Sequence, residues 1–471
     1  MTVFKIIAAL DEKYGYAREE LGMPWTCSDD LKFFKRKTLG NAVLMGANTW
    51  TSLYKKKFKD RINIVVGSSN LESSEGERGE LCGEEHVYFT TSVDKALDIL
   101  FKLKVEKCYV IGGVGLWSEF LERKLINRMY ITHIPGDYLC SKFFNIKDNK
   151  RVNKDFTRKD KIYNEHNNLI VSKYYYKNKE EKKVLSTINK IINKGCYKLD
   201  RSGVGTKSLF GKSFTYDIRN YRLPLFTHRK IFIRGIIEEL LFFISGKTNT
   251  KVLEEKNVNI WKGHTSKEYL DKIINPDRRH LYSEGSYGPA YGFQLRHWGA
   301  EFIGDYEDYT GKGFDQLQYV INLLRTNKTS RRILFSYWNP SVLDKVPLPS
   351  CHLLYNFFVD VEKNELSVSF YQRSNDFALA AAFNVCSASI LVFMLCKVTG
   401  LKPGKCVHNI CDLHLYINQI DSVKQFSNNK AEINYPVMRL SEKNNIEEFD
   451  INDFTLMFYR SHKKYSIPFN V

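Results

Sequence analysis

The sequence predicts two folded domains in a row: an α/β domain with a mostly parallel, twisted sheet, and then a domain of the α+β class. Three observations lead to this prediction. The chain has 471 residues, enough for two or three domains. Its first 135 residues alternate short apolar strands with amphipathic helices, a pattern typical of a parallel sheet with helices on both faces. A different pattern, with a long apolar helix followed by several strands, begins at Val184.

The elements of the first domain follow from apolar runs and from capping residues. Apolar runs predict strands at 5–10, 41–45, 61–66, 86–90, 107–111 and 128–134, and a last edge strand at 168–176. Ser28 and Ser92 each precede a helical pattern and are expected to cap the start of a helix. The first of these helices is expected to end at Gly40. The first domain is therefore predicted to span residues 1–178.

The second domain is predicted to follow a short charged linker at 179–184 and to span 185–471. Its helical patterns lie near 184–192, 234–245 and 314–325, and its strands near 333–338, 353–362 and 365–372. Residues 377–396 carry no formal charge and are long enough to cross a bilayer. Polar residues such as Asn384 interrupt this run, there is no second such run, and the mean hydropathy is −0.37. We therefore expect a buried core helix here, not a membrane span.

Composition limits the classes of partner. The chain has 71 Lys and Arg against 53 Asp and Glu, a formal net charge of +18. Because the basic residues are spread along the chain, they fit small anionic substrates better than a nucleic-acid arm, although RNA binding stays an alternative. Ten cysteines without a C-x-x-C pair argue against a zinc site and against a disulfide scaffold, and no metal is expected. Thiols and an N-terminus unlike a signal peptide predict a cytoplasmic protein.

Asp30 is the first candidate for catalysis, a single carboxylate among aromatic side chains such as Phe34. Loss of water around such a carboxylate raises its pKa toward the range useful for general acid catalysis. The alternative is that Asp29 and Asp30 only stabilise the start of a helix, which is worth about 0.3–1 kcal/mol. Two loops, Met45-Gly-Ala-Asn-Thr-Trp and Val110-Ile-Gly-Gly-Val-Gly, each follow a predicted strand. Their glycines let backbone N–H groups approach a phosphate.

Together with Met23-Pro-Trp, Arg61-Ile-Asn-Ile, Ser68-Ser69 and Tyr130-Ile-Thr-His, these features resemble dihydrofolate reductases in order and spacing over residues 3–178. The resemblance implies hydride transfer from NADPH to dihydrofolate, with Asp30 as the acid. It implies folate contacts at Asp30, Phe34, Arg61, Ile111 and Thr132. It implies NADPH contacts at Ala9, Gly15, Gly46, Asn48, Thr49, Ser68, Gly112, Gly113 and Gly115. Ala47 stands where the family usually has an Arg on the 2′-phosphate, so cofactor affinity or choice is open.

Cys351 is the second candidate for catalysis, and arginines are expected near it. A cysteine attacks as the thiolate, and a nearby guanidinium lowers the pKa of the thiol. Cys351 follows the turn-like Pro347-Leu-Pro-Ser, and the pair Arg331-Arg332 lies twenty residues earlier. Several arginines plus a hydroxyl such as Ser374 suit a phosphate monoester. The alternatives are a small buried thiol and a solvated arginine pair.

The second half also contains long motifs. They are Ser330-Arg-Arg-Ile-Leu, Trp338-Asn-Pro, Pro349-Ser-Cys-His, Tyr371-Gln-Arg-Ser-Asn-Asp, Glu238-Glu-Leu-Leu, Gly288-Pro-Ala-Tyr-Gly and Asp412-x-His414-x-Tyr416. Jointly they resemble thymidylate synthases over about 185–471. The resemblance implies methylation of dUMP by 5,10-methylenetetrahydrofolate, with attack by Cys351 on C6 of the uracil and with Glu239 anchoring proton transfer.

The resemblance also implies the remaining contacts of this site. It implies dUMP contacts at Arg201, Arg331, Arg332, His352, Gln372, Arg373, Ser374, Asn375, Asp376, Asn384, His414 and Tyr416. It implies folate contacts at Trp261 and Asp376. Because the Arg331-Arg332 pair is implied to reach the phosphate of the neighbouring subunit, the resemblance also implies a homodimer.

Several residues that are usual in these families are replaced. The replacements are Trp117, Lys262, Ser350, Asn356, Ala380, Ala382, Ala388, Ile410 and Cys411. Every residue with an implied charged or bond-making role is present, so we expect two active sites. The order of the halves resembles the fused reductase–synthase enzymes of protozoa and plants. The alternative is an active reductase-like half joined to a degenerate, non-catalytic dimerisation module.

Overall fold

The computed structural model describes residues 2–19, 22–67, 86–163, 169–200 and 202–470. The chain divides into two compact units. Unit 1 comprises residues 1–179 together with two short C-terminal pieces, Ala431–Asn434 and Phe458–Arg460, and unit 2 comprises the rest. The charged stretch at 179–184 is not a linker, because Lys179 begins helix α6 (Lys179–Lys194). Val184, Leu185 and other apolar residues of α6 are buried, so tertiary packing extends the helix back through the charged residues.

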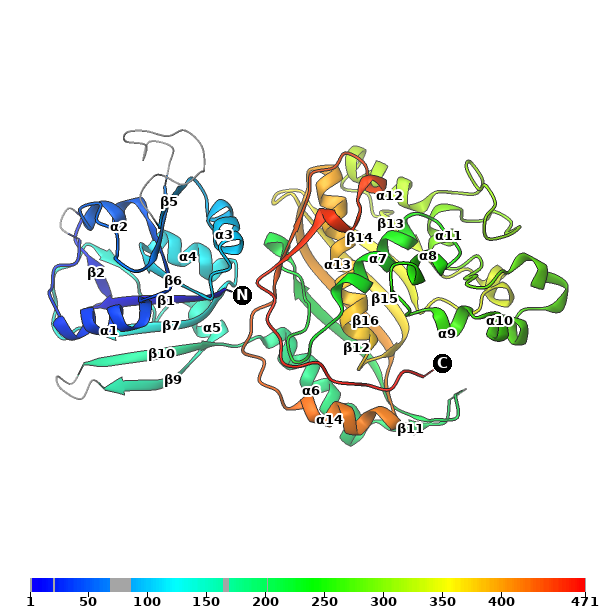
Figure 1. Cartoon of the computed structure of the whole chain (residues 1–471), viewed down its shortest axis with the longest axis horizontal. Helices are drawn as coiled ribbons and strands as arrows, with labels where there is room; N and C mark the ends of the chain where they lie inside the picture. The colour runs from blue at the N-terminus through cyan, green and yellow to red at the C-terminus, as the bar shows by residue number, and fades with distance from the viewer. Residues whose placement is uncertain (1, 20–21, 68–85, 164–168, 201, 471) are drawn as a thin grey trace. The chain divides into compact units, whose positions relative to one another are not determined.

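Unit 1 is built on an eight-stranded sheet in the order β5-β4-β3-β6-β1-β7-β10-β9 (Figure 1). Its strands are β1 (Val3–Leu10), β3 (Ala42–Gly46), β4 (Ile62–Val66), β5 (Val87–Thr90), β6 (Lys107–Gly112), β7 (Ile126–His133), β9 (Phe156–Tyr163) and β10 (Ile170–Tyr176). The strands from β5 to β7 are mutually parallel, and β10 and β9 run antiparallel to their neighbours. The predicted α/β class and mostly parallel sheet are confirmed. A short ribbon, β2 (Gly15–Ala17) with β8 (Lys142–Phe143), lies beside it.

Five helices connect the strands of unit 1. They are α1 (Ser28–Thr38), α2 (Ala47–Ser52), α3 (Val93–Lys102), α4 (Val114–Glu122) and α5 (Lys150–Asp155). Ser92 caps α3 through a hydrogen bond from the Lys95 backbone N–H, as the sequence predicted. At α1, however, the capping position belongs to Cys27, and Ser28 is the first helical residue. The predicted edge strand is also displaced: β10 lies between β7 and β9, so β9 forms the edge.

Unit 2 holds a six-stranded sheet in the order β11-β12-β16-β15-β14-β13 (Figure 1). Its strands are β11 (Cys196–Lys198), β12 (Thr206–Asp217), β13 (Leu334–Ser336), β14 (His352–Asp360), β15 (Glu365–Asp376) and β16 (Lys402–Tyr416). Only the β15–β16 pair is parallel. A separate ribbon joins β17 (Val437–Leu440) and β18 (Phe454–Met457). The predicted α+β class of this half is confirmed.

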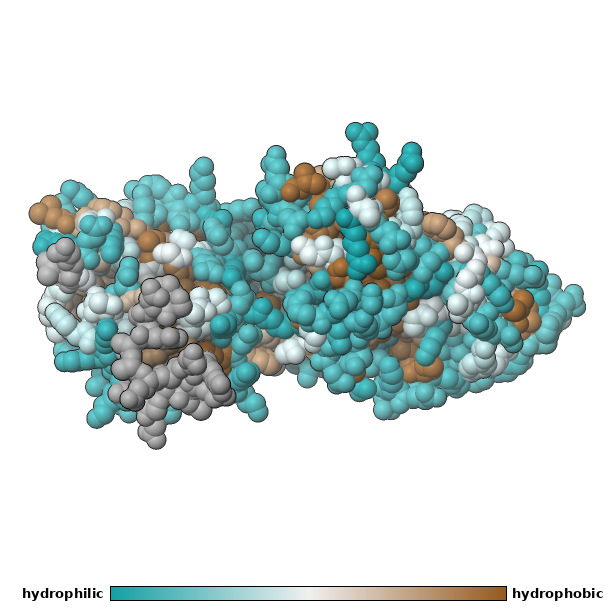
Figure 2. Space-filling view, turned by 90° about the horizontal axis from the view of Figure 1, so that it is seen from above, coloured by the Kyte–Doolittle hydropathy of each residue, from teal (hydrophilic) through white to brown (hydrophobic). Residues whose placement is uncertain are grey.

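Helix α13 (Ala380–Thr399) is the central helix of unit 2 and packs on β15, β16 and α7 (Ile233–Ile244). It is the one described helix whose length and composition would suit a membrane span, and 83% of its apolar window is buried inside the unit. Buried hydrophobic residues lie on every side of α13, a pattern typical of a helix that is fully enclosed in a core. The prediction of a core helix at this place is confirmed. The surface in Figure 2 is mostly hydrophilic, with small separate hydrophobic areas.

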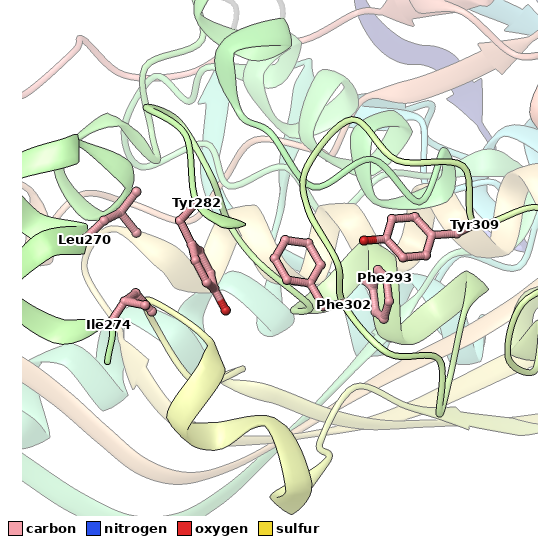
Figure 3. Packing of buried hydrophobic residues seen from close by; sticks show 6 residues of the cluster. All are labelled: Leu270, Ile274, Tyr282, Phe293, Phe302 and Tyr309. Atoms are coloured by element: carbon pink, nitrogen blue, oxygen red, sulfur yellow. The ribbon is translucent and has the colours of Figure 1, made fainter. Parts of the chain in front are cut away.

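Smaller helices complete unit 2 and carry parts of the candidate site. They are α8 (Lys251–Glu254), α9 (Lys262–Thr265), α10 (Lys267–Ile273), α11 (Tyr291–Arg296), α12 (Gln316–Thr326) and α14 (Ile420–Ser427). An aromatic cluster packs α10 and the loop after α11 against α11 itself (Figure 3). In it, the Phe293 and Tyr309 rings meet edge to face with centroids 4.8 Å apart, a favoured aromatic geometry. This packing fixes α11, whose first residue is Tyr291, next to the Cys351 backbone.

Candidate active sites

Asp30 lies in the first turn of α1 and is 9% exposed. Burial raises the pKa of its carboxyl, as the sequence predicted, and the smaller effect of the Thr132 hydroxyl lowers it. Thr132 is fully buried on β7, and its hydroxyl has no hydrogen bond of ordinary geometry to any described residue. Phe34, one turn after Asp30, packs on Phe58 with ring centroids 5.2 Å apart. The site therefore combines a carboxyl whose pKa is raised by burial with an apolar wall.

Arg61 closes the other end of that wall. Its Nε donates to Thr38 Oγ1 at 2.8 Å, and its Nη1 donates to the Lys59 carbonyl at 2.7 Å. The guanidinium carbon lies 5.6 Å from the Phe58 ring centroid and 6.0 Å from that of Phe34. These contacts pre-orient a cation at the edge of the aromatic wall. Ile111, also predicted as a folate contact, packs with Phe34.

The two glycine-containing loops meet because their strands are parallel neighbours. Met45 of β3 stands opposite Gly112 of β6, so the turns into α2 and α4 begin side by side. A Cβ on Gly112 would lie 2.9 Å from Thr49 Oγ1, and Gly112 has φ +154°. A Cβ on Gly113 would lie 3.6 Å from the Tyr16 hydroxyl. The Thr49 side chain thus requires glycine at the start of α4, a place where backbone N–H groups suit a phosphate-bearing ligand.

The remaining predicted cofactor contacts lie in different surroundings. Gly15 adjoins Cys140, where an added Cβ would be 2.4 Å from the cysteine Cβ, so packing alone requires glycine there. Ala9 is buried in a cluster with Trp25. Gly46, Asn48 and Gly115 lie at the starts of α2 and α4. Ser68 lies outside the described residues.

In unit 2, Cys351 immediately precedes β14 and is partly exposed. Its backbone N–H donates to the Tyr291 hydroxyl at 2.8 Å, and its carbonyl accepts from the Arg373 N–H at 3.0 Å. The Arg373 guanidinium donates to the carbonyls of Ser350 at 3.0 Å and Pro349 at 2.7 Å. The backbone that carries the thiol is thus fixed from both sides, and the Arg373 guanidinium is bound to the two carbonyls just before it.

The structure of one chain does not bring all the other predicted phosphate contacts together. Arg331 and Arg332 are exposed, and neither side chain makes a hydrogen bond or ion pair among the described residues. Ser374 stands opposite Asp412 in the β15–β16 pair. Arg201 lies outside the described residues, but the carboxylate of Asp200 next to it organises that loop by accepting from Gly205 N–H at 2.9 Å.

A chain of amide and imidazole groups lies behind the cysteine. His408 Nε2 and Gln372 Oε1 are 2.7 Å apart, and Gln372 Nε2 donates to Asn384 Oδ1 at 3.0 Å. Asn375 Nδ2 donates to both Gln372 Oε1 at 3.0 Å and Asn384 Oδ1 at 2.9 Å. The imidazole of His352 is hydrogen-bonded to Tyr355, and burial lowers the pKa of His352 to about 4. The predicted residues Gln372, Asn375, Asn384 and His352 are therefore brought together by the fold.

Glu239 is a buried carboxyl on α7. Trp261 Nε1 donates to its Oε1 at 2.9 Å, and the Trp261 ring lies 4.5 Å from that of Tyr287. Burial raises the pKa of Glu239 to about 7, and the Trp261 hydrogen bond opposes this shift. The buried Tyr287 hydroxyl has no partner among the described residues. A carboxyl that titrates near neutrality can give or take a proton during turnover.

Asp376, His414 and Tyr416 lie at the ends of β15 and β16. Both oxygens of Asp376 accept hydrogen bonds: Oδ1 from the N–H groups of Ala378 and Leu379, and Oδ2 from Gln419 Nε2 at 2.7 Å. Burial raises the pKa of Asp376. His414 Nδ1 lies 3.5 Å from Asp412 Oδ1, and the His414 and Tyr416 ring centroids are 5.4 Å apart.

Two residues of the site were missed from the sequence. Tyr291 lies inside the motif Gly288-Pro-Ala-Tyr-Gly, so a signal was present but its contact with Cys351 was not predictable from spacing. His408 had no local signal, because the strand that carries it was not predicted. In the part of the chain that the structure describes, no three His, Cys, Asp or Glu side chains gather as metal ligands would.

Comparisons with known proteins agree for both units. The family model "Dihydrofolate reductase" matches residues 3–178, and the model "Thymidylate synthase" matches residues 182–471. The protein "Bifunctional dihydrofolate reductase-thymidylate synthase" of Zea mays is 35% identical, over 98% of this chain and 95% of its own length. Its counterpart in Leishmania major is 32% identical over 98% and 94%, and that in Paramecium tetraurelia 35% over 94% and 93%. With both family models matched in this order and relatives of the same make-up aligned almost end to end, the chain belongs to the bifunctional dihydrofolate reductase-thymidylate synthase family.

Proposed function

We propose that residues 185–471 carry the synthase activity of this bifunctional enzyme at Cys351, and that residues 1–178 carry its reductase activity at Asp30. The synthase converts dUMP and 5,10-methylenetetrahydrofolate to dTMP and dihydrofolate, and the reductase returns dihydrofolate to tetrahydrofolate with NADPH. One observation supports this assignment most: the thiol of Cys351 is partly exposed, and the backbone that carries it is fixed by hydrogen bonds to Tyr291 and Arg373. The alternative of a degenerate synthase half is not supported over two activities, since relatives matched over nearly the whole chain are named for both.

At the synthase site, the Cys351 thiolate attacks C6 of the uracil and forms a covalent adduct, which opens C5 to the one-carbon unit of the folate. Arg373 is proposed to bind the phosphate while its guanidinium also fixes the backbone before the cysteine. The other proposed dUMP contacts are Arg201, His352, Gln372, Ser374, Asp376, Asn384, His414 and Tyr416. Trp261 and Asp376 are proposed to contact the folate.

Glu239 is proposed to move protons at the synthase site. Glu239→Gln is expected to lower kcat for dUMP by about 10²–10³-fold, because general acid–base catalysis is worth that much, with KM changed only a few-fold. The carboxyl works as the donor in its protonated form, and its pKa is about 7, so the logarithm of kcat should fall above pH 7.

The pH profile of synthase turnover checks this prediction. The fall above pH 7 should be absent in Glu239→Gln. It should persist in Glu238→Gln, a neighbouring buried carboxylate that pairs with Lys256 at 2.7 Å. An unchanged pH profile in Glu239→Gln would contradict the assignment.

At the reductase site, the dihydrofolate ring is proposed to lie between Asp30, Phe34, Ile111 and Thr132, with its glutamate tail at Arg61. The buried Thr132 hydroxyl acts on the pKa of Asp30 but makes no hydrogen bond of ordinary geometry within the described residues, so a polar ring fits beside the pair. NADPH supplies the hydride when bound. Its proposed contacts are Ala9, Gly15, Gly46, Asn48, Thr49, Ser68, Gly112, Gly113 and Gly115, and the close backbone at Gly112 fits a phosphate group there.

A homodimer is proposed through the outer face of the unit 2 sheet. Large apolar side chains of four strands are exposed on it; they are Phe210, Leu334, Leu354, Phe358 and Tyr371. Phe210 is 86% exposed and Phe358 67%, which is unusual for strand residues of a protein that acts alone. In such a dimer, the exposed Arg331 and Arg332 would reach the phosphate of the partner subunit. Sedimentation equilibrium that returns the 55.0 kDa of one chain would contradict the dimer.

The nine described cysteines form no disulfide, which supports a reducing compartment, the cytoplasm, as the place of action. Fractionation of expressing cells checks this placement.

The experiment that tests the proposed function as a whole uses the full chain with 5-fluoro-dUMP and methylenetetrahydrofolate. A covalent complex on a denaturing gel, mapped to Cys351 by mass spectrometry, is the expected result. NADPH oxidation with dihydrofolate, followed in the same sample, reports the reductase half. A chain that oxidises NADPH but forms no complex would overturn the synthase assignment.

A further inference from the structure

Asn375 makes contacts that a residue touching substrate directly would not need. It lies on β15 and is 2% exposed. Both hydrogens of its amide nitrogen are used inside the protein, one on Gln372 Oε1 and one on Asn384 Oδ1. Its own Oδ1 is buried and has no hydrogen-bond partner among the described residues. The side chain therefore acts through the two amides that it bridges.

The hydrogen bonds of this cluster have one consistent direction. Burial lowers the pKa of His408 well below its usual value, so the imidazole is neutral, and Nε2–H donates to Gln372 Oε1 at 2.7 Å. Gln372 Oε1 accepts hydrogen bonds from His408 and Asn375, so the other end of the amide, Nε2, donates to Asn384 Oδ1. An amide oxygen has two lone pairs, so the donors Gln372 and Asn375 together saturate Asn384 Oδ1.

What remains of Asn384 is its NH2 group. Asn384 is partly exposed, and its side chain also bonds to His352, a contact that raises the pKa of that imidazole and so has the amide oxygen as acceptor; no hydrogen bond from its Nδ2 is found within the described residues. The amide therefore offers a donor to whatever occupies the site. A donor matches the carbonyl at C4 of a uracil-type base and opposes the amino group at C4 of a cytosine-type base.

We infer that Asn375 is a positioning residue that fixes the orientation of the Asn384 amide, and thereby makes the synthase site select uracil over cytosine nucleotides. The inference rests on the proposed function of that site. It assigns to Asn375 an action through Asn384 in place of a direct contact with dUMP.

The sharpest variant is Asn375→Asp. It keeps the shape of the side chain but replaces a donor with a carboxylate, which only accepts. Facing Gln372 Oε1 and Asn384 Oδ1, the carboxylate repels both oxygens. Rotation of both amides by half a turn, with His408 changing to the tautomer that accepts at Nε2, relieves the repulsion and keeps every donor on an acceptor. Asn384 then presents Oδ1 to the substrate, and an acceptor matches the 4-amino group of a cytosine-type base.

The experiment measures tritium release from 5-tritiated dUMP and from 5-tritiated dCMP, with binding of each nucleotide by calorimetry. In Asn375→Asp, the ratio of kcat/KM for dUMP to that for dCMP is expected to fall by about 100-fold, the scale of a reversed hydrogen-bond match. In Asn375→Ala the ratio should fall by about tenfold, because the amide is released but not reversed. Lowering the pH should restore part of the ratio in Asn375→Asp alone, since a protonated carboxyl can donate again.

Asn322→Asp is the matched control. Asn322 also accepts an amide hydrogen bond from a glutamine, Gln318 Nε2, at 2.9 Å, but on the exposed surface of α12. Its ratio should equal that of the wild type. If both Asn375 variants weaken dUMP and dCMP equally, so that the ratio stays unchanged, Asn375 is only structural and the inference is overturned; Asn375→Ala decides if Asn375→Asp does not fold. Wild-type enzyme that releases no tritium from dUMP would instead overturn the proposed function, a different result.

Discussion

Cys351→Ser is expected to lose synthase turnover by roughly 10⁴-fold or more, the scale seen when a covalent nucleophile is removed. The backbone hydrogen bonds from Cys351 to Tyr291 and Arg373 do not involve the side chain, so the variant should keep the local geometry. A serine hydroxyl is a much weaker nucleophile than a cysteine thiol, because far less of it ionises at neutral pH. Tritium release from 5-tritiated dUMP measures the loss, and the complex with 5-fluoro-dUMP should be absent from a denaturing gel.

Two controls make this result specific. Cys196→Ser changes an exposed thiol on β11 and should leave both activities at the wild-type level. The reductase rate of Cys351→Ser itself should also stay unchanged, because Asp30 belongs to the other unit. Tritium release by Cys351→Ser at more than a tenth of the wild-type rate would show that another group attacks the pyrimidine.

Asp30→Asn is expected to lower the reductase kcat by about 10²–10³-fold, within the range that a general acid contributes. An amide of the same shape keeps the packing against Phe34 but cannot release a proton. Burial raises the pKa of Asp30 in the folded state, so the wild-type rate should fall as pH rises through that pKa. The variant should lack this fall. Stopped-flow NADPH oxidation as a function of pH measures both effects.

The raised pKa of Asp30 also predicts that the variant Asp30→Asn is more stable than the wild type at neutral pH. A carboxyl whose pKa is higher in the folded than in the unfolded chain binds more protons when folded, so stability falls as pH rises from the unfolded pKa through the folded one. Above the folded-state pKa, the buried charged carboxylate lowers the free energy of unfolding by an amount that no longer depends on pH. Asp30→Asn should therefore raise the Tm of unit 1 at pH 7 but not at pH 3. Asp29→Asn, one residue earlier, should keep the wild-type reductase rate. If Asp29→Asn and Asp30→Asn lose the same fraction of the reductase rate, Asp30 is not the acid.

The elements that the sequence predicted well are those with strong local periodicity. Helix α3 begins where Ser92 predicts it, and the seven strands predicted for unit 1 match the structure within two residues, whereas β2, β8 and β9 were not predicted. The long strands β12 and β16 were missed, since their residues alternate between the core and the exposed outer face and include few continuous apolar runs. The charged start of α6 was taken for a linker because its stabilising contacts are tertiary, not local. Edge position was also misjudged, because it depends on where β9 pairs and not on β10 itself.

Sequence alone determined the family and the order of the two halves, and its motifs supplied the candidate residues for the chemistry. Tertiary structure decided the contacts, the pKa values and the hydrogen-bond partners of those residues. It placed Tyr291 on the Cys351 backbone, buried Glu239 until its pKa reached about 7, and aligned His408, Gln372, Asn375 and Asn384 into one directed network. The physical reason is that pKa values and amide orientations depend on desolvation and on hydrogen-bond partners. Those partners come from strands and helices far apart in the chain.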